Sequence, residues 1–396
     1  MRTARILAFS LVVSSAACSS GGSGDASPVV SPVNSDPAAT VTSSPDTATD
    51  TSSPETSSSE TTSSDTPSPD TSIAPASTDA SGNDVASPAE VDGGGTGDEP
   101  LVIDGPAQVR MSCASLPQGV SEFTLEGGGA VHDVRIYVPE TVSSDPAPVV
   151  LNWHGLGSSG PDQAAFSGYE TVAEEEGFVV VHATGIDGGT GSNSWELAQF
   201  ATDDRDDLAF ADALIDTVVA DWCGDPARIY STGMSNGGLF TSELVCNRSA
   251  RIAAAASIAG TTHAPGCDPE RAVPYIAFHG TADDVVPFDA DEPSVLLPQA
   301  GVDALIDDTT PGEFAEFAAD FGCEPDPTPV EETPEVVRYD YAGCADDVAL
   351  AFYEIIGGGH TWPSSPLSDV LDGFGYFTQD VDATRDAWAF MSQYSL

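Results

Sequence analysis

A serine between two glycines is the residue of this chain best placed to do chemistry. Ser235 stands in the run 233–237, which reads Gly-Met-Ser-Asn-Gly. The apolar run 227–232 before it predicts a strand, and the segment 238–245 after it predicts a helix. In the order strand, G-x-S-x-G and helix, a sharp turn lifts the serine hydroxyl above the end of a sheet. The pattern therefore predicts a nucleophilic serine.

A carboxylate and a base that could activate Ser235 follow it in the chain. Asp283 lies in a loop beyond the apolar run 274–279, which predicts a buried strand. Of the six histidines only His360 comes after Asp283, and it follows a strand-like run at 348–356 and three glycines. The order serine, carboxylate, histidine accompanies the G-x-S-x-G turn. His360 would take the serine proton, and Asp283 would orient the imidazole and stabilise its charged form.

The negative oxygen formed by attack on a carbonyl needs backbone N–H donors. We expect one from Asn236, the residue after the serine, and the other from Leu156 in the loop after the predicted strand 149–153. We expect His154 to support this loop rather than to transfer protons. Trp195 and Trp362 are candidates for lining a substrate pocket, and simple packing of their loops is the alternative.

Other motifs accompany the three residues, in one order, over about 121–363. They are His-Gly at 154–155, Asp-Asp-Leu-Ala-Phe at 206–210, Arg-Ile-Tyr at 228–230, Gly-Met-Ser-Asn-Gly-Gly at 233–238, His-Gly-Thr-Ala-Asp at 279–283 with Val-Pro at 286–287, and Gly-His-Thr-Trp-Pro at 359–363. The chain resembles the secreted polyhydroxybutyrate depolymerase and feruloyl esterase family of α/β-hydrolases. The resemblance implies the triad Ser235, Asp283 and His360. The stretch 289–311 is longer and more acidic than expected of that family, so the pocket rim is expected to differ.

The pattern of apolar runs predicts one large α/β domain at 101–396, a mostly parallel sheet with helices on both faces. By resemblance this is the α/β-hydrolase fold. Strands are expected near 131–138, 149–153, 178–182, 229–232, 254–258, 275–278 and 348–355. Helices are expected near 163–176, 207–221, 238–246, 312–321 and 383–391.

The first hundred residues do not read as a folded domain. Residues 1–18 combine two arginines, a short apolar run and small residues before Cys18, which predicts a secretory signal. The cysteine resembles a bacterial lipobox, so we expect lipidation at Cys18, with ordinary cleavage and free secretion as the alternative. Residues 19–100 are rich in Ser, Thr, Pro, Asp and Ala and predict a disordered linker.

Seven cysteines favour an oxidising compartment. With Cys18 set aside, six remain for disulfides, and we expect Cys323 to pair with Cys344. Cys223 and Cys246 could also pair, because both are expected at helix ends beside one strand. No C-x-x-C spacing occurs, so these cysteines do not predict a metal site.

The net charge of −52 excludes some partners. Residues 1–100 hold fourteen acidic residues and two arginines, which leaves −40 on the remainder, and the chain has no lysine. Nucleic acid and anionic membranes would be repelled, whereas a neutral ester or polyester would not. Contact with a membrane is expected only through a lipid at Cys18. Asp206 and Asp207 stand at an expected helix start, where capping is a better explanation than metal binding.

Together these features favour an extracellular, cofactor-free serine hydrolase of carboxylic esters that works through an acyl-enzyme on Ser235. Polyhydroxybutyrate depolymerase is the first expectation, and a feruloyl or acetyl xylan esterase acting on plant polysaccharide is the alternative. A serine peptidase of this fold would carry a propeller or large cap, for which the chain has no room. A catalytically inactive surface lipoprotein would not need the complete set of residues.

Overall fold

The computed structural model describes residues 113–396, except 143, 189–190, 201–204 and 371–372. The predicted signal with Cys18 and the linker 19–100 lie outside the described residues. What is described belongs to one unit of the chain, Asp98–Leu396. Within that described part, none of the helices has both the length and the apolar character needed to cross a membrane.

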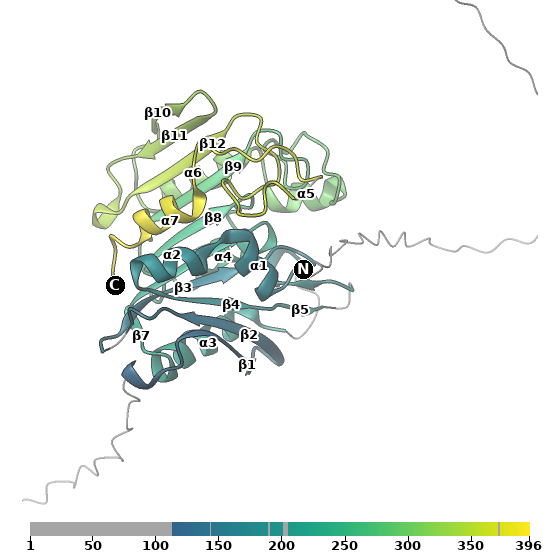
Figure 1. The fold of residues 1–396 in the computed structure, drawn as a ribbon. Coiled ribbons are helices and arrows are strands. Elements are labelled where there is room, and N and C mark those ends of the chain that lie inside the picture. The colour runs from purple at the N-terminus through teal and green to yellow at the C-terminus, as the bar shows by residue number, and fades with distance from the viewer. Residues whose placement is uncertain (1–112, 143, 189–190, 201–204, 371–372) are drawn as a thin grey trace, which may run out of the picture. The chain divides into compact units, whose positions relative to one another are not determined.

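A single large sheet organises the domain (Figure 1), with the strand order β1-β2-β4-β3-β7-β8-β9-β12-β11-β10. The central strands from β4 to β12 run parallel, and the strands outside them pair antiparallel. The bounds are β1 Gly119–Gly127, β2 Ala130–Val138, β3 Ala147–Trp153, β4 Val179–Ala183, β7 Gly224–Met234, β8 Ala254–Ile258, β9 Tyr275–Gly280, β10 Thr328–Thr333, β11 Val336–Tyr341 and β12 Leu350–Ile355. This mostly parallel sheet confirms the predicted α/β class.

Helices pack on both faces of the sheet because its central strands are apolar on both faces. Along β4, Val179 and Val181 join one core, which includes side chains of α3, α4 and α6, and Val180 joins the other, with those of α2 and α7. The helices are α1 Gly160–Ser167, α2 Tyr169–Glu176, α3 Asp207–Asp221, α4 Asn236–Asn247, α5 Gln299–Leu305, α6 Thr310–Asp320 and α7 Ala383–Met391. A two-stranded ribbon, β5 Ile186–Asp187 with β6 Asn193–Ser194, stands apart from the sheet.

The structure differs from the predicted elements in several places. The single helix expected over 163–176 is two helices, because Gly168 takes a left-handed conformation with φ 71° and ends α1. The acidic stretch 289–311 contains the short helix α5, and its ends meet in a β-bridge between Asp289 and Thr309. The outer strands β1, β10 and β11 were not predicted.

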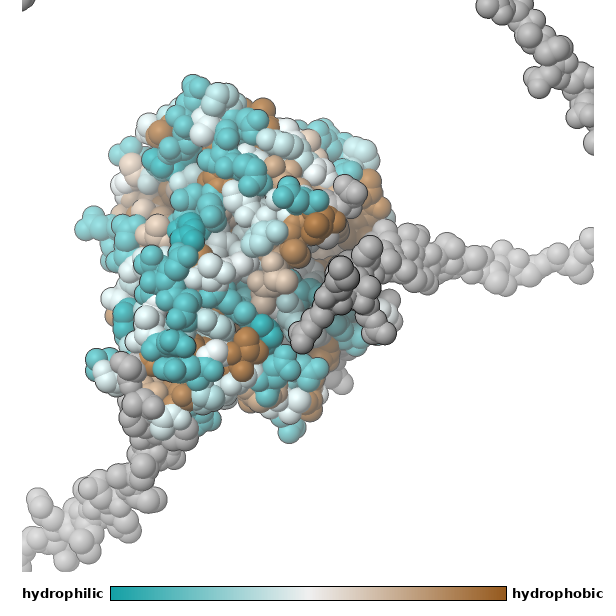
Figure 2. Space-filling view, in the orientation of Figure 1, coloured by the Kyte–Doolittle hydropathy of each residue, from teal (hydrophilic) through white to brown (hydrophobic). Residues whose placement is uncertain are grey.

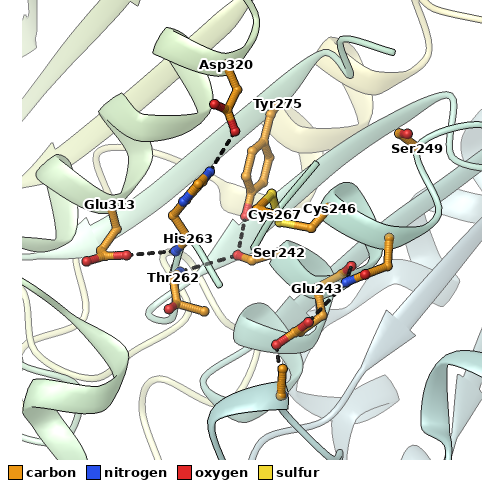
Figure 3. The surroundings of a disulfide bond; sticks show 12 residues. Ser242, Glu243, Cys246, Ser249, Thr262, His263, Cys267, Tyr275, Glu313 and Asp320 are labelled. Carbon is orange, nitrogen blue, oxygen red and sulfur yellow. Dashed lines mark hydrogen bonds and ion pairs between the residues drawn. A yellow bond between two sulfur atoms is a disulfide. The ribbon is translucent and has the colours of Figure 1, made fainter. Parts of the chain in front are cut away.

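Three disulfides join segments that lie on the α4 and α6 side of the sheet. Cys323 pairs with Cys344, as predicted. The pairing suggested for Cys223 with Cys246 is wrong. Cys223 takes a left-handed turn with φ 60° before β7 and pairs with Cys113, which precedes β1. Cys246 ends α4 beside the loop after β8 and pairs with Cys267 of that loop (Figure 3).

Buried histidines make the stability of this domain dependent on pH. Burial lowers the pKa of His154 to about 4 and that of His182 to about 3. Neither ring nitrogen of His182 has a hydrogen-bond partner in the described part of the chain. A histidine held neutral in the folded state is protonated first in the unfolded state. Its contribution is therefore complete above pH 6.5 and is lost as the pH falls toward the folded-state pKa.

The unfolding free energy should fall between pH 7.5 and pH 5. We expect this fall to be about 2 kcal/mol smaller in His182→Leu than in the unmodified protein. The reason is that leucine is apolar and of similar size, and it cannot gain a proton in the unfolded chain. Urea titrations of both proteins at the two pH values measure this difference. An unchanged pH dependence in the variant would show that His182 is not neutral in the folded state.

Candidate active site

Ser235 occupies a strained turn between β7 and α4. Its backbone has φ 55° and ψ −124°, a conformation rarely adopted by a residue with a side chain. Its N–H donates to the Ile258 carbonyl at 2.9 Å, and its own carbonyl accepts from the Leu239 N–H at 2.9 Å. Ser235 is largely buried, with 9% of the residue exposed. The turn thus presents the hydroxyl in one fixed place.

The two glycines of the motif are required by close backbone approach. A Cβ on Gly237 would lie 2.2 Å from the carbonyl oxygen of Trp153, and a Cβ on Gly233 would lie 2.4 Å from that of Gly237. Both distances are far below van der Waals contact. The glycines therefore let α4 begin directly against the end of β3.

Asp283 and His360 are joined as the sequence order predicted. The Nδ1 atom of His360 lies 2.8 Å from Oδ2 of Asp283, and both residues are buried. The other carboxylate oxygen accepts the backbone N–H groups of Val285 and Val286 at 2.9 and 3.0 Å. Burial alone would raise the pKa of Asp283, but its interactions with His360, His279 and the Val285 N–H hold it below the ordinary value. The carboxylate is therefore ionised at neutral pH.

The topology places Ser235 at the same edge of the sheet as this pair. Ser235 directly follows β7, Asp283 follows β9, and His360 follows β12. β7, β8, β9 and β12 are parallel neighbours, so their carboxyl ends and the loops after them share one edge.

His279 supports Asp283 and was not singled out in the sequence. It lies in β9, and its Nε2 atom is 2.9 Å from the Val286 carbonyl and 3.5 Å from Oδ2 of Asp283. Burial lowers the pKa of His279, so the ring stays neutral and its N–H donates to Val286. The signal for this role was the spacing of four residues between a strand-end histidine and the aspartate.

His154 fixes the peptide that carries the Leu156 N–H. Its Nε2 accepts the Gly185 N–H at 2.8 Å, which leaves the proton on Nδ1, 2.7 Å from the Gly155 carbonyl. In a trans peptide the N–H points opposite to the carbonyl, so the Leu156 N–H points away from the His154 ring. Gly155 is also next to Ser235, because a Cβ on it would lie 3.3 Å from Cβ of Ser235.

Asn236 joins the turn to the segment that contains Trp195. Its side-chain amide accepts the Trp195 N–H at 2.7 Å and donates to the Trp195 carbonyl at 3.0 Å. Asn236 is the first residue of α4, so its backbone N–H stands at the start of the helix. Among the described residues, no backbone bond outside the regular elements uses the N–H of Asn236 or Leu156. The N–H of Asn236 and that of Leu156, which follows Gly155 in the chain, are therefore the candidates for an oxyanion hole.

The predicted pocket role of Trp195 and Trp362 needs correction. Trp195 is 2% exposed, and its indole N–H donates to the His154 carbonyl at 3.1 Å. Trp362 is fully buried, and its N–H donates to Thr384 at 2.9 Å. Neither ring has a face free for a substrate, since both pack in the core beneath the loops. Packing, the alternative considered for both, is what the structure shows.

The acidic pair at the start of α3 has structural roles. Asp206 is the N-cap of α3 and accepts the Ala209 N–H at 2.8 Å, as expected of a capping residue. Asp207 is buried and accepts the Glu196 N–H at 2.7 Å, which holds the loop after β6. In the described residues, His263, Cys267 and Asp320 form the one group with metal-ligand spacing, but Cys267 is in a disulfide.

A comparison with models of protein families finds no match. The chain is similar to a bifunctional acetylxylan esterase/xylanase of Neocallimastix patriciarum, with 26% identity over 257 residues, 64% of this chain and 34% of that protein. It is 28% identical over 271 residues to feruloyl esterase B of Piromyces equi, 66% of this chain and 45% of that protein. The chain thus spans less than half the length of these two curated relatives.

A probable feruloyl esterase C of Aspergillus clavatus is 31% identical over 173 residues, 43% of this chain and 54% of that protein. Among solved structures, an acetyl xylan esterase from Aspergillus awamori is similar with a TM-score of 0.45 and 18% identity, over 61% of this chain and 94% of that one. The curated homologues thus include proteins named feruloyl esterase and acetylxylan esterase. The parallel sheet and the turn at Ser235 are those of the α/β-hydrolase fold.

We expect Gly237→Ala to lower the unfolding free energy by about 3 kcal/mol, because the new methyl group would overlap the Trp153 carbonyl. Gly301→Ala is the matched control. Gly301 is also a helical glycine, but a Cβ there would make ordinary contacts of 3.5 Å or more. The control should change stability by less than about 1 kcal/mol. Denaturant unfolding measures both, and equal effects would contradict the close approach.

Proposed function

We propose that the protein is a serine hydrolase of carboxylic esters, in which Ser235, Asp283 and His360 form the catalytic triad. The observation that carries the proposal is the buried bond from His360 to an ionised Asp283, at the sheet edge where the strained turn presents Ser235. An imidazole oriented through Nδ1 has Nε2 available to accept the serine proton. No cofactor is needed for this reaction.

The proposed reaction has two steps. The Ser235 oxygen attacks the ester carbonyl while His360 takes its proton, and the N–H groups of Asn236 and Leu156 stabilise the negative oxygen. The C–O bond to the alcohol then breaks, and His360 returns the proton to the departing alkoxide. Water, deprotonated by His360, attacks the acyl-enzyme in the second step and releases the acid and the free serine. Asp283 stabilises the imidazolium formed in each step.

Esters of plant polysaccharide are the substrates we propose. The support is that the relatives reported above are named feruloyl esterase and acetylxylan esterase. None of these three names mentions polyhydroxybutyrate, so the alternative of the sequence analysis now replaces its first expectation. The acidity of the chain is compatible with a neutral polysaccharide and unfavourable for a polyanionic one.

The place of action we propose is outside the cell. Three disulfides indicate that this domain belongs to an oxidising compartment. A lipid on Cys18 and the linker 19–100 would hold the enzyme at the surface of the cell envelope. Metabolic labelling with a palmitate analogue, compared between the full chain and Cys18→Ser, would detect such a lipid.

We expect Ser235→Ala to lower ester hydrolysis by about four orders of magnitude or more, because the nucleophile is lost. The assays compare release of acid from methyl ferulate, acetylated xylan and amorphous polyhydroxybutyrate. Ser144→Ala, an exposed serine in the loop before β3, is the matched control and should keep full activity.

The three substrates separate the outcomes. Serine-dependent release of ferulate or acetate would support the proposed function. Release from the polyester alone would instead establish a polyester depolymerase. Hydrolysis that survives in Ser235→Ala would contradict the triad itself.

A further inference from the structure

Tyr376 is an exposed aromatic residue attached to the loop of His360. The segment around it pairs with Gly358 in a parallel β-bridge. The Tyr376 carbonyl accepts the Gly359 N–H at 3.1 Å and the Thr361 hydroxyl at 3.2 Å, one residue on each side of His360. Although these contacts fix its backbone, 48% of the residue is exposed. A tyrosine thus stands in solvent beside the catalytic base.

The other end of the Tyr376 side chain is also fixed. Its hydroxyl donates to Oε2 of Glu335 at 2.8 Å, and the same oxygen accepts the Thr378 hydroxyl at 3.2 Å. The backbone of Glu335 is held in turn, since its carbonyl accepts the Ile356 N–H at 2.8 Å. The ring is therefore fixed at both ends while remaining accessible. A ring fixed in this way loses little conformational entropy when a ligand stacks on it.

We propose that Tyr376 is a stacking platform for a neutral sugar ring in the alcohol part of the ester, an inference that rests on the proposed function. His360 gives its proton to the departing alcohol, so the alcohol part must lie on the histidine side of the site. Tyr376 is the exposed aromatic residue tied to that side. Ile356, whose N–H donates to the Glu335 carbonyl, is a second exposed apolar residue bonded to Glu335, with 48% of it exposed.

The charges around the ring favour a neutral sugar over an acidic one. The Glu335 carboxylate lies at the edge of the platform, and the domain as a whole is strongly acidic. A chain of uronic acids would be repelled there, whereas an uncharged sugar would meet only the ring face and neighbouring hydrogen-bonding groups. Tyr376 would accordingly determine specificity for the alcohol and would take no part in the chemistry.

Two esters of one acid test the proposal with the full chain. Methyl ferulate has no ring on its alcohol side, and a feruloylated arabinoxylo-oligosaccharide has several. In Tyr376→Ala, we expect the ratio of kcat/KM for the oligosaccharide ester to that for methyl ferulate to fall about five- to tenfold, chiefly through KM. Tyr376→Phe keeps the ring and should retain most of the ratio. Val370 follows His360 in the same loop and is 72% exposed, so Val370→Ala is the matched control and should leave the ratio unchanged.

A binding measurement separates this inference from the proposed function. Unesterified arabinoxylo-oligosaccharide is titrated into Ser235→Ala and into the double variant with Tyr376→Ala, and calorimetry measures both affinities. Weaker binding by the double variant supports the platform even if no ester is cleaved. Equal affinities, or equal losses of kcat/KM on both esters, would overturn it and leave Tyr376 as a support of the His360 loop. If the unmodified chain hydrolyses neither methyl ferulate nor the oligosaccharide ester, the proposed function fails. The two measured affinities for the unesterified oligosaccharide then test the role of Tyr376 by themselves.

Discussion

The whole site depends on one contact in which two stretches of backbone touch with no side chain between them. Gly237 at the start of α4 lies against the carbonyl of Trp153 at the end of β3. This contact fixes the position of Ser235 on one side and the start of the loop with His154 and Leu156 on the other. The proposed nucleophile and the proposed oxyanion donors are therefore placed by the same packing.

At this edge of the sheet, the buried negative charge of Asp283 is stabilised by several hydrogen-bond donors. Asp283 accepts two backbone N–H groups and the His360 ring, and the neutral His279 closes its surroundings. A buried carboxylate with this many donors remains ionised despite the loss of water. It can then stabilise a transient positive charge on His360 without moving.

Much of the fold and part of the site could be predicted from local sequence. The central strands are apolar on both faces, so the runs around β3, β7 and β9 were visible. Cys323 and Cys344 bound the segment before the last predicted strand, and they pair as expected. The edge strand β10 has no buried residue and carries two glutamates, so it lacks the apolar pattern by which a strand is predicted. The pairing of Cys113 with Cys223 joins residues 110 positions apart and depends on how distant segments meet, which no local pattern contains.

Side-chain roles were harder to predict than residue types. Trp195 and Trp362 were expected to face a substrate because they stand near the catalytic motifs, yet tertiary packing buries both. The three glycines before His360 did not reveal their role in the sequence. In the structure Gly359 allows close packing, because a Cβ there would lie 2.3 Å from the Phe374 carbonyl. Adjacency in sequence indicated which loops mattered but not which way their side chains point.

The two hydrogen bonds between the Asn236 amide and the backbone of Trp195, one donated by each side, have a consequence for evolution and engineering. The residue that supplies the proposed oxyanion N–H also holds the loop after β6. A loop transplanted from a relative with another residue after its nucleophile would lose both bonds, and the catalytic turn would lose its neighbour. Residue 236 and this loop therefore depend on each other, and a chimera must exchange them together.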